Sequence, residues 1–270
     1  MPKLAIEGVS MLLLLFVPQP VLSQTPETST NTNEQAQRTA CPVEHDALED
    51  ALRKSIKPGG GPSNGGFDNN EWAATVNREG KVCALVHSGK NVDDQWLGSR
   101  AIAAEKASTA NAFSLGNKAV ATANLYAAAQ PGGFLFGAAA ANPAVPETIY
   151  AGDPKQFGTR EDPMIGKTSG GVIVFGGGLA LYDSSGNIVG ALGVSGDTAC
   201  ADHNVAWRVR HSLGLDHVPS GVSPNMKDAI IYDIGPAGKS ASGFGHPKCV
   251  GRETQIAVDL GAGVSSDEVR

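Results

Sequence analysis

Apolar residues follow two different spacings along the chain, and each spacing predicts one kind of element. Positions that recur every three or four residues predict helices over residues 42–56, 98–113 and 202–213. A further helical segment, 118–130, stops at a Pro-Gly-Gly sequence. Short apolar runs bounded by turn residues predict strands over 71–77, 81–89, 171–175, 179–182 and 188–194.

The order of these elements predicts an α+β fold. The first two strands are joined by the turn 78–80, which favours a hairpin, and glycine-rich turns separate the last three strands as in a meander. Helices precede, separate and follow these groups of strands. We therefore expect an antiparallel sheet of about five strands flanked by helices.

The polar and irregular stretches divide the chain further. Residues 1–23 contain a short apolar run that ends at small residues, which is typical of a secretory signal peptide, and the polar segment 24–40 is expected to be disordered. The main domain is then 41–214, with a Pro- and Gly-rich insertion at 131–170. The C-terminal extension, 215–270, is too polar to form a core of its own.

Composition and charge narrow the partners and the compartment. The net charge of −6 gives no basic surface for nucleic acid, and no apolar run is long enough for a membrane span. With a signal peptide, we expect a periplasmic or secreted protein, in which cysteines form disulfides.

Four cysteines, Cys41, Cys83, Cys200 and Cys249, allow three pairings. A helix, a loop and a hairpin bring the chain back to its starting level, so Cys41 and Cys83 can meet. The remaining pair is then Cys200–Cys249, which would pin the extension to the domain. A peptide map under non-reducing conditions would distinguish the three pairings.

Two apparent active-site motifs do not meet the requirements of their chemistry. Ser195 lies in a Gly-Val-Ser-Gly sequence whose second glycine is one position too early for a nucleophile elbow, so we assign no catalytic serine. The glycine-rich segment around 176–178 matches neither phosphate-binding pattern and is explained by turns between strands.

Three side chains remain as candidates for a ligand site. His45 borders the apolar face of the first helix, and His203 lies beside Asp202, the expected N-cap of the last helix. Each histidine is either an iron ligand or a structural imidazole. Lys106 interrupts a small and apolar helix, either as a lysine that reaches to the surface or as a cation for an anionic group such as a haem propionate.

The sequences "KASTANAF", "GGVIVFGGG" and "GALGVSG", followed by an Asp-bearing helix, resemble the GlcG/HbpS family of haem-binding proteins. The resemblance covers about residues 42–214. It implies a profilin- or PAS-like domain, haem or corrinoid binding, and a homo-oligomer. It also implies a histidine ligand near the first helix, for which His45 is the counterpart.

We therefore expect an exported protein that binds a small molecule, haem or a related tetrapyrrole, through His45, His203 and Lys106, with no catalytic residue assigned. One alternative is an enzyme that acts on a small organic acid in a pocket lined by Asp197, Asp202 and His203. Another is a structural or partner-binding oligomer without a cofactor. The absorption spectrum of the purified protein would separate the first class from the others.

Overall fold

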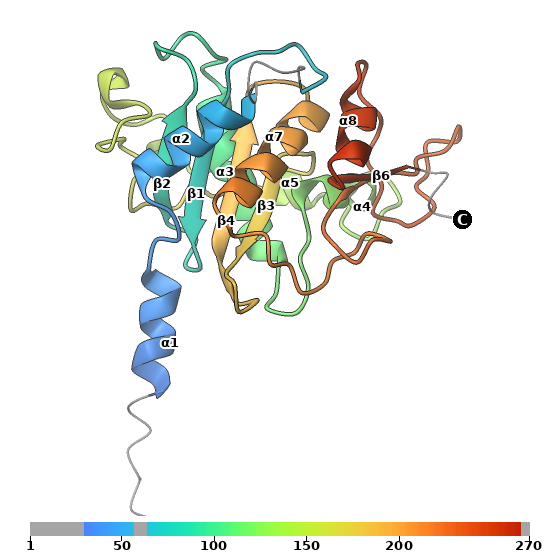
Figure 1. Ribbon diagram of the computed structural model, residues 1–270, viewed down its shortest axis with the longest axis horizontal. Helices are drawn as coiled ribbons and strands as arrows, with labels where there is room; N and C mark the ends of the chain where they lie inside the picture. Colours follow the sequence, from blue (N-terminus) through green and yellow to red (C-terminus); the bar gives the residue numbers. More distant parts are fainter. Residues whose placement is uncertain (1–29, 57–63, 266–270) are drawn as a thin grey trace, which may run out of the picture.

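A four-stranded antiparallel sheet forms the centre of the computed structural model, which describes residues 30–56 and 64–265 (Figure 1). The strands are β1 (Trp72–Asn77), β2 (Val82–His87), β3 (Gly178–Tyr182) and β4 (Ile188–Ser195), in the order β2-β1-β4-β3. β1 and β4 are the central pair, so the two strands farthest apart in sequence lie side by side. The predicted signal peptide, residues 1–23, lies outside the described residues.

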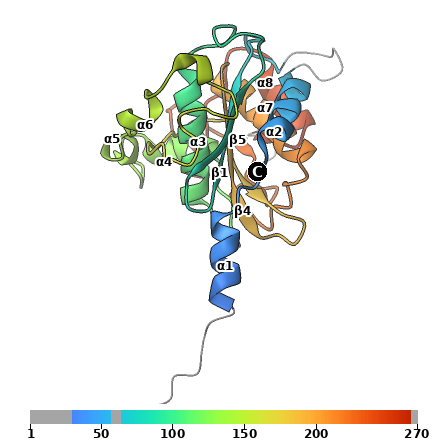
Figure 2. The same cartoon turned by 90° about the vertical axis from the view of Figure 1, so that its left-hand side faces the viewer.

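Helices cover both faces of the sheet. α3 (Ser99–Phe113) packs on one face, whereas α2 (His45–Ile56) and α7 (Ala199–Ser212) pack on the other (Figure 2). The two faces bury separate apolar clusters, one with Leu48, Leu52 and Val205, the other with alanines of α3 and Trp72. This arrangement confirms the predicted α+β class with an antiparallel sheet between helices.

Glycine and alanine set the distance between α3 and the sheet. A Cβ atom on Gly193 of β4 would lie 2.0 Å from the Ala103 carbonyl oxygen and 2.5 Å from the Ala107 nitrogen. Such contacts are far below van der Waals separation, so only glycine permits the helix backbone to approach this closely. The glycine-rich strand and the alanine-rich helix are therefore two halves of one packing arrangement.

The strand expected at 171–175 does not form, which leaves four strands in the sheet instead of about five. This segment runs along α3, where the Ile173 amide donates to the Thr109 hydroxyl at 3.0 Å. At its end the Gly176 amide lies 3.4 Å from His246 Nε2. Side chains thus satisfy amides that a neighbouring strand would otherwise bind.

Helix boundaries differ from expectation at both ends of the domain. A helix, α1 (Thr30–Thr39), occupies most of the segment expected to be disordered, and it extends away from the body (Figure 1). Asn77 ties its end to the sheet by donating to the Thr39 carbonyl at 2.8 Å. α7 begins three residues earlier than expected because Thr198, whose hydroxyl accepts from the Ala201 amide, is its N-cap instead of Asp202.

The connection between α3 and β3 is made of short helical turns instead of one long helix and a loop. They are η2 (Thr122–Leu125), α4 (Tyr126–Ala129), α5 (Ala138–Ala141), α6 (Pro146–Ile149) and η3 (Pro154–Gln156). The insertion is not confined to the surface, because Met164 is buried and the Asp162 carboxylate forms a buried ion pair with Arg100 of α3.

The C-terminal extension joins the main core instead of forming one. β5 (Ile230–Tyr232) pairs in parallel with β6 (Gly263–Ser265), and α8 (Glu253–Asp259) lies between them in sequence. Ile230, Tyr232 and Ala257 belong to the cluster beneath α7. Disulfides join Cys41 to Cys83 and Cys200 to Cys249, which is the pairing expected from the sequence. No helix in the described ranges is both long and apolar enough to cross a bilayer.

Candidate functional site

A buried ion pair links the two helical layers at one end of the sheet. Lys106 Nζ of α3 donates to Asp202 Oδ2 of α7 at 2.6 Å and to the Val194 carbonyl at 2.9 Å. The two side chains are 0% and 2% exposed. Glycine at position 177 makes room for them, since a Cβ there would lie 2.8 Å from Lys106 Nζ.

Asp202 also organises the turn that follows β4. Its Oδ1 accepts hydrogen bonds from the amides of Gly196 and Asp197, at 3.1 and 2.8 Å. Burial raises the pKa of Asp202 to about 6, although Lys106 acts in the opposite direction. Lys106 and the two amides together give both oxygens of the Asp202 carboxylate a hydrogen-bond partner within the protein.

Two further carboxylates, Glu71 and Asp197, lie close to the Lys106–Asp202 pair. Glu71 precedes β1 and is fully buried, and burial together with the charges of Asp202 and Asp197 raises its pKa well above the usual range. Among the described residues, Glu71 Oε2 has no hydrogen-bond partner. No motif in the sequence marked Glu71, because its place in the cluster depends on the pairing of β1 with β4.

His203 lies in the interior between α7 and the C-terminal extension. Its Nε2 contacts the Ala262 carbonyl at 3.2 Å, so that nitrogen carries the proton, and Nδ1 has no partner within the described ranges. Burial lowers the pKa of His203 to about 3 and that of His246, which lies nearby, to about 4. Both imidazoles are therefore neutral at physiological pH.

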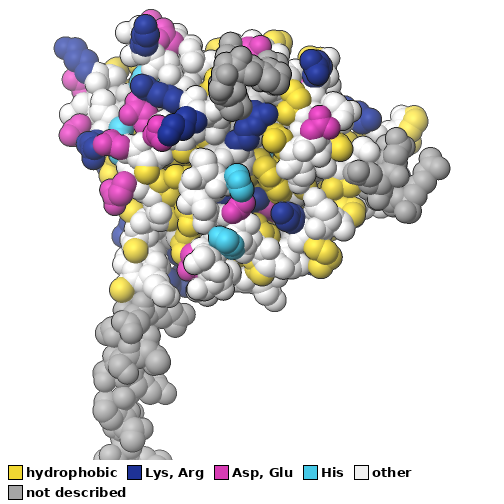
Figure 3. All heavy atoms as spheres, viewed as in Figure 1, with side chains coloured by type: hydrophobic (Ala, Val, Ile, Leu, Met, Phe, Trp, Pro, Cys, Tyr) yellow, Lys and Arg dark blue, Asp and Glu magenta, His cyan; other side chains and the backbone are white. Residues whose placement is uncertain are grey.

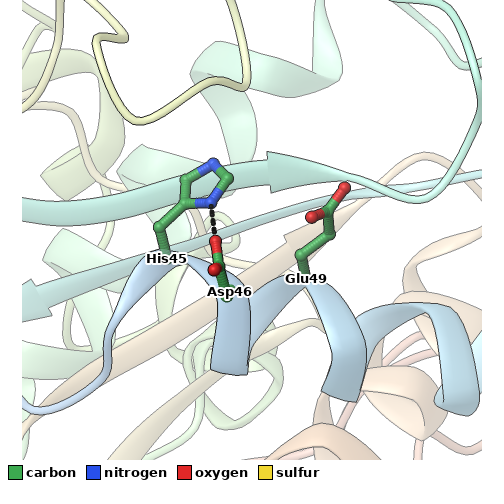
Figure 4. A group of neighbouring side chains, drawn as sticks. All are labelled: His45, Asp46 and Glu49. Carbon is green, nitrogen blue, oxygen red and sulfur yellow. Dashed lines mark hydrogen bonds and ion pairs between the residues drawn. The ribbon is translucent and has the colours of Figure 1, made fainter.

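His45 occupies the first position of α2 and holds the insertion against that helix. Its Nε2 lies 3.0 Å from the Gly158 carbonyl, and its Nδ1 lies 3.1 Å from Asp46 Oδ1 (Figure 4). The side chain is 14% exposed, so it is the most accessible of the three predicted ligand residues.

Glu49 lies one turn after His45, close enough for these two residues and Asp46 to offer three ligand atoms to a metal ion (Figure 4). Both carboxylates are already paired with cations, Asp46 with Arg160 and Glu49 with Arg53. The group is thus a surface ion-pair network in the structure as described.

The clefts lined by described residues include those of about 570, 520 and 300 Å³. None of their linings contains a histidine or Lys106. Asp197, Asp202 and His203, expected in the alternative enzyme to line one pocket, are likewise absent from these linings. Exposed histidines occur elsewhere: His211 Nδ1 pairs with Asp216 at 2.7 Å, and histidine lies beside acidic side chains on the face shown in Figure 3.

The structure therefore does not bring the three predicted ligand residues together. Lys106 contacts Asp202, the neighbour of His203, but His203 faces the extension and His45 faces the insertion. The interpretation of Lys106 as a surface lysine is wrong, because its ammonium group is buried.

The chain is similar to solved structures of two other proteins. Klebsiella pneumoniae protein ORFY, whose crystal structure is described with the family DUF336, is 20% identical, with coverage of 62% of this chain and 86% of that one and a TM-score of 0.42. The crystal structure of the PduOC:heme complex is 21% identical, with coverage of 64% and 94% and a TM-score of 0.41. A search of curated proteins found no match.

A family model described as "Haem degrading protein HbpS-like" matches residues 69–210, more than half of the chain. The match runs from the residues before β1 to the last turn of α7. It thus includes the sheet, α3 and both partners of the Lys106–Asp202 ion pair. The chain belongs to the HbpS-like family.

Proposed function

We propose that this protein binds haem or a related tetrapyrrole. Membership of a family described by haem degradation carries the proposal. Export to the periplasm or beyond is part of it, supported by the two disulfides and by the apolar run in residues 11–17. Self-association to a homo-oligomer is a further part, which rests on the family resemblance.

The three predicted contacts differ in how well they fit such a ligand. Lys106 does not fit, because its three donors face Asp202 and a carbonyl in the interior. His203 does not fit either, because its imidazole is enclosed by protein. His45 fits best. Gly158 holds Nε2 through its carbonyl, the usual arrangement for a histidine that ligates a metal through its other nitrogen, and Nδ1 becomes available when the exposed Asp46, which also pairs with Arg160, turns away.

We therefore propose that His45 Nδ1 would bind the iron of the tetrapyrrole. Haem supplies a redox-active iron when bound. The chain's own part is to orient the imidazole: Gly158 accepts the Nε2 proton, and Asp162 fixes the position of Gly158 by accepting from its amide at 2.8 Å. The buried ion pair of Asp162 with Arg100 anchors this support to α3.

Titration of the purified protein with haemin tests the proposal. We expect a shifted Soret band, and a loss of affinity of about tenfold or more in His45→Ala, because the ligand to iron is removed. His45→Gln separates ligation from support, since its amide can still donate to the Gly158 carbonyl. His211→Ala is the control, because it removes an exposed imidazole that also contacts a carboxylate.

Two results would contradict the proposal in different ways. A haemin spectrum that is the same with and without protein would remove tetrapyrrole binding altogether. A normal Soret shift and affinity in both His45 variants would keep tetrapyrrole binding and remove His45 from the site. Circular dichroism of each variant establishes that α2 and the sheet are intact.

A further inference from the structure

The cleft of about 570 Å³ lies at the end of the sheet where α1 joins the body. Its walls come from the last turn of α1 and the connection to α2, from the β1–β2 turn, from the β3–β4 turn with the start of β4, and from Gly116 and Leu215. This volume lies within the range of about 300–1,000 Å³ that small-molecule sites occupy. The disulfide of Cys41, which lines the cleft, holds one wall against β2.

Two arginines, Arg38 and Arg78, line this cleft. Arg78 is partly buried, and its Nη1 donates to the carbonyl and side-chain oxygens of Asn111. Burial is the main cause that lowers the pKa of Arg78, and the positive charge of the nearby Arg38 lowers it further. No ion pair joins either arginine to a carboxylate within residues 30–56 and 64–265.

The one carboxylate in the lining is already satisfied. Asp183 Oδ1 accepts hydrogen bonds from the amides of Ser185 and Asn187, each at 2.9 Å, within the β3–β4 turn. Backbone donors thus hold Asp183 in the turn, but its negative charge remains, so two arginines and one carboxylate give the lining a net positive charge. An anion that reached both would relieve the repulsion between them and gain charge-assisted hydrogen bonds.

Apolar side chains form another part of the lining, which also includes the polar residues Gln37 and Asn187. Pro42, Ile188, Val189 and Leu215 contribute aliphatic surface beside the arginines. Aliphatic walls with a few fixed polar groups are the usual composition of a ligand pocket. The occupant that matches both parts has an apolar body and a carboxylate group.

We propose that this cleft binds the carboxylate end of an apolar small molecule through Arg38 and Arg78. The arginine fork suits a carboxylate because it can donate two parallel hydrogen bonds. Two sources share this chemistry: the propionates of a tetrapyrrole and the head group of a smaller aliphatic acid. The proposal concerns a different part of the chain from His45 and does not depend on iron ligation.

Three probes distinguish the sources. Metal-free protoporphyrin IX carries two carboxylates but cannot be held by an iron ligand, and its dimethyl ester keeps the ring without the charges. Octanoate is the small aliphatic acid. Binding of the porphyrins is measured by fluorescence, and binding of octanoate by calorimetry, on the full chain.

Arg38→Gln is the test variant, because Arg38 is exposed and makes no ion pair in the described residues. We expect it to weaken binding of the charged probe that the cleft accepts by about tenfold. Binding of the dimethyl ester should not respond to the substitution. Arg252→Gln removes the same charge at another exposed site, in the C-terminal extension and outside the cleft lining, and is the matched control, expected to leave all affinities unchanged.

The responses of the two charged probes to Arg38→Gln distinguish the possible ligands. A response of protoporphyrin alone supports a tetrapyrrole, a response of octanoate alone supports a small acid, and a response of both supports the shared chemistry. The proposal is overturned if neither charged probe binds, if Arg38→Gln changes neither affinity, or if Arg252→Gln weakens binding equally. An octanoate response without any haemin binding would retain the cleft and reject the proposed tetrapyrrole function.

Discussion

Substitution of Lys106 tests whether this side chain stabilises the fold or contacts a ligand. Lys106→Met keeps most of the side-chain volume but removes the ammonium group that contacts Asp202 and the Val194 carbonyl, at 2.6 and 2.9 Å. If Lys106 is structural, the free energy of unfolding falls. If it contacts a ligand carboxylate, ligand affinity falls instead.

The size of the expected loss follows from the burial of the pair. Removing one partner of a fully buried ion pair costs about 3–5 kcal/mol, a large part of the roughly 5–15 kcal/mol that stabilises a typical domain. Asp202 keeps two backbone donors in the variant, from Gly196 and Asp197, which favours the lower end of that range. Since the pKa of Asp202 is about 6, much of the carboxylate is protonated at pH 5, and the loss should be smaller there than at pH 7.

The assay is urea denaturation followed by tryptophan fluorescence and circular dichroism at pH 7 and pH 5. A cycle with Asp202→Asn measures the interaction energy of the pair. Lys54→Met, which removes an exposed lysine paired with Asp50, is the control and should cost no more than about 1 kcal/mol. A loss below about 1 kcal/mol in Lys106→Met, combined with a clear drop in haemin affinity, would refute the structural assignment.

Two further predictions concern the histidine in α7 and the disulfide at α2. The folded pKa of His203 lies below its usual value, so the stability it contributes is complete above about pH 6.5 and is lost as the pH falls toward 3; between pH 7.5 and 5 the loss is about 2 kcal/mol. His203→Gln should lose correspondingly less over this interval in denaturant titrations, and an unchanged pH dependence would contradict the burial of a neutral imidazole. Replacing Cys41 and Cys83 by serine opens a loop of 42 residues and should lower the free energy of unfolding by about 4 kcal/mol. Denaturation of the oxidised wild type and the double variant measures this difference, and equal midpoints would show that the disulfide adds no stability.

Local patterns were sufficient for the sheet and for the three helices packed on it. In α2, apolar residues recur at helical spacing because Leu48, Leu52 and Ile56 lie on the face that packs against β2 and α7. β1 is an apolar run because it is buried along its whole length. The segment 171–175 has the same apolar composition as a strand, but its amide at Ile173 bonds to Thr109 of α3, so composition could not reveal the absence of a pairing partner. The N-cap of α7 was misplaced for a related reason: Asp202 is a good capping residue whose carboxylate is occupied by the turn and Lys106.

The candidate site depended more strongly on long-range contacts. Glu71 and Asp202 are separated by most of the domain in sequence, and the central β1–β4 pairing brings them into one cluster. Arg38 and Arg78 lie in segments with no recognisable motif, and only the course of the chain around Cys41 places both beside one cleft. Charged residues that carry no periodicity leave no signal that a sequence pattern can detect.

By itself, the sequence determined the class of fold, the four strands of the sheet, the three helices packed on it, the disulfide candidates and the motifs shared with the HbpS-like family. Each of these follows from residues that are close together in the chain. The tertiary structure alone decided that Lys106 is a buried partner of Asp202, that His203 is enclosed, and that two arginines line one cleft. The physical reason is that burial and electrostatic interaction depend on distance in space, and the Lys106–Asp202 contact spans 96 positions of the chain.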